Sequence, residues 1–83
     1  LGEQTAEVLA LLEETLEAAG SDKSRILSVQ IFLTDISRIA EMNAVWDAWV
    51  PAGTAPARAT VEAKLASPGH DIEITAVAAK KAA

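Results

Sequence analysis

Arg58 is the first residue whose type and position could support chemistry. It opens the polar side of ARATVEAKL, residues 57–65, where Arg58, Thr60, Glu62 and Lys64 alternate with small apolar residues. This alternation is typical of a β-strand with one apolar face. A planar guanidinium matches a carboxylate through two parallel hydrogen bonds, so Arg58 could hold a small carboxylate. By residue type alone, a solvated arginine at a sheet edge fits equally well.

Glu73 is the second candidate. It lies in DIEITAVAA, residues 71–79, which follows SPGH at 67–70, a sequence that favours a type II turn. We therefore predict that the two segments pair as an antiparallel hairpin. In that register Lys64 lies opposite Glu73 as a cross-strand ion pair, and Arg58 has no acidic partner.

The other common motifs of enzyme chemistry are missing from the sequence. There is no glycine-rich nucleotide loop, no HExxH helix and no nucleophile elbow. The chain has no cysteine, which excludes disulfides and thiolate-bound metals. The one histidine, His70, falls in the predicted turn, where a histidine is more often solvated than functional. We expect neither a metal nor a cofactor.

Length and charge indicate one small acidic domain, residues 1–83. A domain of this size buries only about 60–65% of its unfolded surface, so association between chains is a common way to complete the core. Seven basic residues against twelve acidic ones give a net charge of −5, which makes nucleic acid an unfavourable partner. No apolar run approaches the roughly 20 residues of a membrane helix, and no signal segment opens the chain, so a cytoplasmic location is expected.

The positions of apolar residues predict a helix and then a strand in the first half. Residues 3–19 repeat apolar residues every three or four positions, and Gly20 is expected to end this helix. Residues 25–33 alternate as a strand. One face of that strand is predicted to carry Leu27, Val29, Ile31 and Leu33.

A second helix is predicted after this strand. TDIS opens it, with Asp35 or Ser37 as the N-cap, and Pro51 and Gly53 end it. Its buried stripe is expected to contain Ile39, Met42, Trp46 and Trp49. Core packing is the preferred interpretation of both tryptophans.

The order helix, strand, helix, strand, strand defines an α/β (α+β) fold. The central strand–helix–strand unit is expected to be a right-handed parallel crossover, and the last two strands a hairpin. This gives a small mixed sheet with both helices on one face. The other face carries small, half-apolar residues, and we interpret it as a subunit interface.

Four stretches resemble the Rid (YjgF) family of reactive imine deaminases, also labelled L-PSP endoribonucleases: PARATVEAKL, DIEITAVAA, MNAVWDAWV and AAGSDKSRIL. The resemblance covers essentially the whole chain. It implies a chorismate-mutase-like homotrimer with ligand clefts between subunits. It also implies cofactor-free hydrolysis of 2-imino or enamine acids, of the 2-iminobutanoate and 2-iminopropanoate type, to 2-oxo acids and ammonia.

The resemblance also implies roles for individual residues. Arg58 matches the arginine that binds the substrate carboxylate, Glu73 the catalytic carboxylate that handles water, and Asn43 an asparagine near the cleft. Thr60 takes a position where members often have cysteine, and Thr75 one where they often have a second glutamate. These two departures could alter substrate choice. The family's N-terminal strands, which contribute to the cleft, have no counterpart in residues 1–83.

The predicted hairpin separates the two principal residues. Glu73 lies six positions along from Arg58, which is roughly 20 Å at about 3.3 Å per residue. They could therefore meet on one small substrate only across a subunit boundary.

Two other functions remain open at this point. One is a non-catalytic trimer that binds small carboxylates or acts as a stress-related interaction protein. The other is the ribonuclease or translation-inhibitor activity of the older label. The acidic balance and the lack of a histidine-based acid–base pair weigh against that one.

Overall fold

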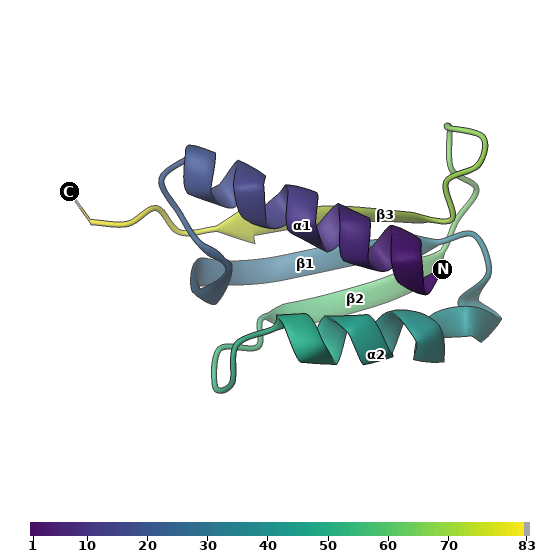
Figure 1. Ribbon diagram of the computed structural model, residues 1–83, viewed down its shortest axis with the longest axis horizontal. Coiled ribbons are helices and arrows are strands. Elements are labelled where there is room, and N and C mark those ends of the chain that lie inside the picture. The colour runs from purple at the N-terminus through teal and green to yellow at the C-terminus, as the bar shows by residue number, and fades with distance from the viewer. Residues whose placement is uncertain (83) are drawn as a thin grey trace.

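The chain folds into two helices and three strands in the predicted order (Figure 1). The computed structural model describes residues 1–82. Its elements are α1 (Gly2–Ala18), η1 (Lys23–Arg25), β1 (Ile26–Leu33), η2 (Ile36–Arg38), α2 (Ile39–Trp49), β2 (Ala57–Glu62) and β3 (Ile72–Ala78), where η marks a short 3-10 helix.

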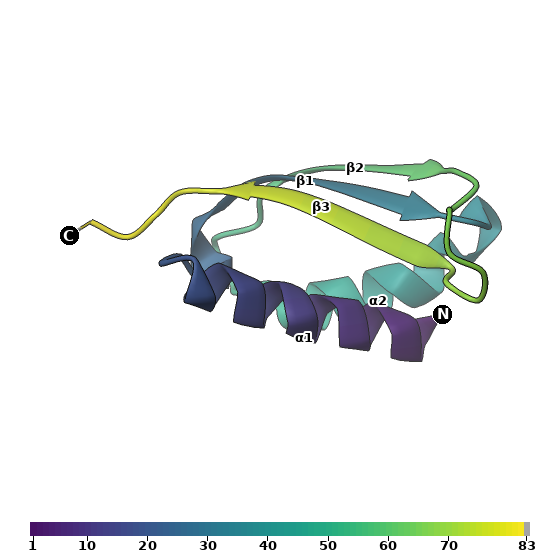
Figure 2. The ribbon, with the colours of Figure 1, turned by 90° about the horizontal axis from the view of Figure 1, so that it is seen from above.

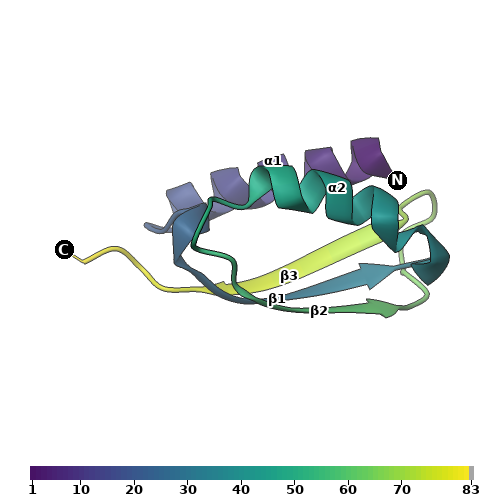
Figure 3. The same ribbon diagram turned by 90° about the horizontal axis from the view of Figure 1, so that it is seen from below.

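The strands form one mixed sheet in the order β2-β1-β3. β1 pairs in parallel with β2 and antiparallel with β3. Both helices cover the same face of this sheet, and the other face is open (Figures 2 and 3). The mixed sheet, the parallel β1–α2–β2 unit and the one-sided helix layer are therefore as predicted.

The predicted hairpin between the last two strands is wrong. The SPGH turn does form, with Gly69 at a φ of 84° and the His70 N–H donating to the Ser67 carbonyl at 3.4 Å. β2 and β3, however, lie at opposite edges of the sheet with β1 between them. The expected ion pair between Lys64 and Glu73 is consequently absent from residues 1–82, and Lys64 lies beyond the end of β2.

The connection between β2 and β3 passes across the end of β1. The Ala63 N–H donates to the Leu33 carbonyl at 2.9 Å, and the Thr34 N–H donates to the Asp71 carbonyl at 3.1 Å. The position of β1 has a hydrophobic reason, because it is the most deeply buried strand, with Ile31 and Leu33 fully enclosed. A central position gives such a strand neighbours on both sides, whereas a hairpin would have left it at an edge.

A β-bulge changes which residues of β1 face the helices. Ile26 is buried and Leu27 is 60% exposed, so the prediction that Leu27 shares the buried face is wrong. The pairing register with β3 shifts between Ile26 and Ser28, and one extra residue in a strand reverses the alternation beyond it. From Val29 onward the predicted face is correct.

The core lies between the sheet and the two helices. It consists of Leu9, Leu16, Ile26, Val29, Ile31, Leu33, Met42, Trp46 and Ile72. α1 ends as predicted, with Gly20 in the left-handed region at a φ of 84°. Thr5 is also fully buried, which its polar side chain did not suggest. Its hydroxyl donates to the Leu1 carbonyl at 2.9 Å, which satisfies the buried oxygen.

Asp35 caps η2, the short turn that leads into α2, whereas α2 itself begins after Arg38 without a side-chain cap, so the cap predicted for the second helix belongs to η2. One oxygen of its carboxylate accepts the Ser37 hydroxyl at 2.6 Å and the Ser37 N–H at 3.0 Å. Hydrogen bonding from the Ser37 hydroxyl, followed by that from its N–H, lowers the pKa of Asp35 below its ordinary value of 3.8. The cap therefore depends on the charged form of this side chain.

Two leucines of β1 allow a matched stability test. Leu33→Ala is expected to lower the free energy of unfolding by about 2–5 kcal/mol, because the side chain is fully buried. Leu27→Ala removes the same atoms from an exposed site of the same strand and is expected to cost less than about 1 kcal/mol. Urea unfolding followed by tryptophan fluorescence measures both. Equal losses would contradict the bulged register.

The Asp35 cap predicts a pH dependence. Because the folded pKa is lowered, its stabilising contribution is complete above the ordinary value of 3.8 and is lost as the pH falls through the folded pKa. The stability difference between the wild type and Asp35→Asn should therefore change in that acidic range and stay constant above about pH 5. Ser37→Ala removes the main donor and should move the change to higher pH. Urea midpoints across the range measure the effect, and parallel curves would exclude it.

Candidate functional site

Arg58 extends from β2 toward α2. In the parallel pairing of β1 with β2, Arg58 lies beside Val29, which is buried on the helix-covered side of the sheet. Its Cζ lies over the ring of Trp46, 5.6 Å from the centroid, and its Nη1 donates to the Met42 sulfur at 3.8 Å. Within residues 1–82 the guanidinium has no ion-pair partner, as predicted. Arg58 thus carries an uncompensated positive charge beside an aromatic ring.

Asn43 and Thr60 lie on the two elements that carry Arg58 and its contacts, α2 and β2. Thr60 lies two residues after Arg58 and therefore on the same side of β2, and Asn43 follows Met42 in α2. The Asn43 Oδ1 and the Thr60 Oγ1 are both buried and have no hydrogen-bond partner in the described residues. Buried polar atoms are nearly always paired, so the two unpaired oxygens are unusual.

Glu73 lies elsewhere. It is in β3, on the opposite edge of the sheet, and pairs with Phe32 on the open face, whereas Arg58 aligns with Val29 on the helix-covered face. Two strand spacings and an offset of three residues put their Cα atoms roughly 14 Å apart. The separation of roughly 20 Å expected from a hairpin is therefore too long. In the observed sheet the two side chains also point to opposite faces. One chain does not bring them together.

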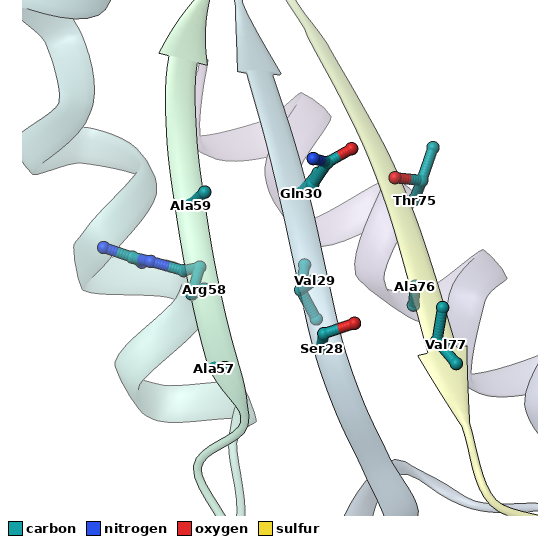
Figure 4. A pocket seen from close by; sticks show the side chains of 9 residues that line it. All are labelled: Ser28, Val29, Gln30, Ala57, Arg58, Ala59, Thr75, Ala76 and Val77. Atoms are coloured by element: carbon teal, nitrogen blue, oxygen red, sulfur yellow. The ribbon is translucent and has the colours of Figure 1, made fainter.

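Two hollows reflect this division. One lies across the three strands, and its lining includes Ser28, Gln30, Arg58, Thr75 and Val77. The Arg58 side chain extends past the edge of β2 toward α2 (Figure 4). The other lies beside β3 and is lined by Val8, Leu65, Ala66, Ser67, His70, Ile72, Glu73 and Ile74. Glu73 therefore shares a hollow with His70, which the sequence indicated only as a solvated turn residue.

Sequence reasoning missed the neighbours of Arg58. Met42 and Trp46 were expected only in the core, and both are buried, yet both also contact the guanidinium. Their spacing of four positions puts them on one helix face. A helix that connects two parallel strands packs onto those strands, so a contact between α2 and β2 could be expected. Which side of β2 faces α2, however, depends on the register of the sheet.

Residues 1–82 contain neither a metal-binding cluster nor a helix suited to a membrane. No group of three or more histidine, aspartate or glutamate side chains is arranged to hold a metal ion in this part of the chain. None of its helices has the length and apolar character needed to cross a membrane.

Comparison with known proteins identifies relatives along nearly the whole chain. The sequence profile described as Endoribonuclease L-PSP matches residues 1–80. A RutC family protein of Haemophilus influenzae is 51% identical over 76 residues, which cover 92% of this chain and 66% of that protein. The RutC family protein YoaB of Escherichia coli is 53% identical over 77 residues, covering 93% of this chain and 68% of YoaB.

Solved structures agree with the sequence relatives. A crystal structure of a YjgF family member from Neisseria meningitidis superposes with a TM-score of 0.92 at 52% sequence identity, covering 95% of this chain and 66% of that one. The α+β fold described above is therefore the fold of that family. The chain belongs to the YjgF/RutC family, also described as Endoribonuclease L-PSP. It spans about two thirds of the length of these relatives.

Proposed function

We propose that this protein hydrolyses reactive 2-imino or enamine acids to 2-oxo acids and ammonia. The observation that carries the proposal is the Arg58 guanidinium, which has no acidic partner in residues 1–82. A free planar cation suits the carboxylate that every such substrate carries. Asn43 and Thr60, with their unpaired buried oxygens, complete the proposed binding layer.

The proposed site is shared between subunits of a homotrimer. Arg58 and Glu73 leave opposite faces of the sheet at opposite edges, so one small substrate can reach both only if they come from different chains. The open sheet face supports association, because Val61 and Val77 are large apolar residues exposed on it. Burial of these side chains between chains would complete a small core.

The proposed reaction needs only these residues and water. Arg58 binds the carboxylate and thereby fixes the adjacent C=N carbon. Glu73 of the partner subunit orients a water molecule and accepts one of its protons as the oxygen attacks that carbon. That proton passes to the nitrogen to give a carbinolamine, and the hydroxyl proton then follows it as C=O forms and the C–N bond breaks. Imine plus water thus gives 2-oxo acid plus ammonia, with no change of oxidation state.

A non-catalytic carboxylate binder is the second candidate. The contacts of Arg58 with Met42 and Trp46 would serve binding alone, without any contribution from Glu73. Acceleration of imine hydrolysis separates the two functions. A ribonuclease is less well supported, because the net charge of −5 disfavours phosphate binding.

The first functional prediction concerns Arg58. Arg58→Lys keeps the charge and loses the planar fork, so it should weaken the binding of pyruvate, the simplest 2-oxo acid product, by about 1–3 kcal/mol. Arg25→Lys, an exposed arginine of η1, is the matched control and should leave the affinity unchanged. Isothermal calorimetry measures both dissociation constants. Equal affinities of wild type and Arg58→Lys would remove Arg58 from the site.

The second functional prediction concerns the shared site and tests catalysis directly. An amino-acid oxidase supplies the imino acid, and the rate of 2-oxo acid formation is followed. Arg58→Ala and Glu73→Ala should each abolish acceleration. Mixed refolding at equal amounts should restore it, because each mixed trimer has one interface with both residues intact, so about a quarter of all clefts are complete.

This experiment uses the protein in its natural full length, since the relatives extend beyond the matched region. Native mass spectrometry must show trimers and subunit exchange. Exchange without recovered activity would exclude a site shared in this way. A wild type that binds pyruvate without accelerating hydrolysis would favour the non-catalytic binder.

A further inference from the structure

Trp46 lies under the positive charge of Arg58. The Cζ of Arg58 is 5.6 Å from the centroid of the Trp46 ring, within the range in which a cation is attracted to the face of an indole. Trp46 itself is only 6% exposed, and Arg58 remains exposed. The pair therefore joins a fixed aromatic ring to an accessible cation.

The Trp46 ring also contacts a second tryptophan. Trp49 contacts it, with ring centroids 5.7 Å apart and planes tilted by 39°. Trp49 is in turn held from α1, because its indole N–H donates to the Glu13 carboxylate at 3.0 Å. The Lys23 ammonium lies 5.3 Å from the centroid of the Trp49 ring and 3.5 Å from that same carboxylate. The hydrogen bond and the cation contact hold Trp49 itself, whereas its contact with Trp46 is between the two rings, which a phenylalanine at position 49 would keep.

An aromatic ring orients an arginine without neutralising it. A carboxylate partner would occupy the guanidinium fork and compete with an incoming substrate, whereas the face of an indole accepts no strong hydrogen bond. Arg58 has five N–H donors, and the one hydrogen bond it makes in the described residues is the long contact to the Met42 sulfur. Most of its donors are therefore available to a ligand.

We infer that Trp46 is a positioning residue: its ring holds the Arg58 guanidinium in the orientation that receives the substrate carboxylate. This inference rests on the proposed function for the identity of the ligand, but the contact itself can be tested without it. Trp46 thus acts through Arg58. Because a buried tryptophan also contributes to stability, loss of activity alone would not establish this role.

The test compares three variants of the protein. Trp46→Leu removes the ring, Trp46→Phe keeps a smaller one, and Trp49→Phe is the control, since it changes the neighbouring tryptophan and leaves the ring under Arg58 in place. Amide NMR spectra establish that each variant is folded. If Trp46→Leu does not fold, Trp46→Phe carries the test, because phenylalanine attracts cations less strongly than tryptophan.

Two measurements are made on each variant. The first is the NMR shift of the Arg58 side-chain protons in the free protein, which a ring beneath them moves upfield. The second is the dissociation constant for pyruvate. Trp46→Leu should abolish the upfield shift and weaken binding about three- to tenfold, with Trp46→Phe between it and the wild type. Trp49→Phe should preserve both values.

The outcomes separate the inference from the proposed function. An Arg58 shift that does not respond to loss of the Trp46 ring, or an unchanged pyruvate affinity in folded Trp46→Leu, would overturn the inference. A wild type that does not bind pyruvate would overturn the proposed function instead. In that case the NMR measurement alone tests whether Trp46 orients Arg58. Loss of the upfield shift in Trp46→Leu would support this role, and an unchanged shift would overturn it.

Discussion

The pairing of β1 with both other strands is the constraint on which the rest of the structure depends. β1 makes all the ladder hydrogen bonds between strands, in parallel with β2 and antiparallel with β3. Its helix-facing side supplies Val29, Ile31 and Leu33 to the core. Each helix packs against this surface, and the positions of Arg58, Thr60 and Glu73 are set by the register of their strands with β1.

That register explains the unusual chemistry of β2. In a sheet with one covered face, the polar side of a strand ordinarily points to solvent, but the polar residues of β2 lie beneath or beside α2. Two of them make contacts there: Arg58 contacts Met42 and Trp46, and the Glu62 carboxylate accepts the Ile36 N–H at 3.0 Å. The small residues between them point to the open face. The Arg58 guanidinium, the proposed binding group, therefore lies at the edge of the core.

The sequence predicted what depends on local chemistry. Gly20 ends α1, Asp35 caps the entry to α2, and Gly69 takes the positive φ of the turn. The partner of a strand is not local: SPGH fixes the turn, but it does not decide whether the next strand returns beside β2 or beyond β1. The bulge at Leu27 and the contact between Trp46 and Arg58 likewise depend on register, which no residue spacing records. Resemblance to a family indicated the candidate site residues. That Arg58 and Thr60 lie on the helix-covered face of the sheet and Glu73 on the open face could be seen only in the structure.

The central position of β1 also affects how the chain is made. During synthesis β1 leaves the ribosome before either strand that will flank it, and β3 follows only at Ile72–Ala78. Because synthesis adds roughly 5–20 residues per second, the apolar segment ILSVQIFL has no partner strand for a period on the order of seconds. Among the described residues, α1 precedes β1 and can cover it during that interval. The acidic outer surface of this helix, with Glu3, Glu7, Glu14 and Glu17, would then keep the nascent chain in solution.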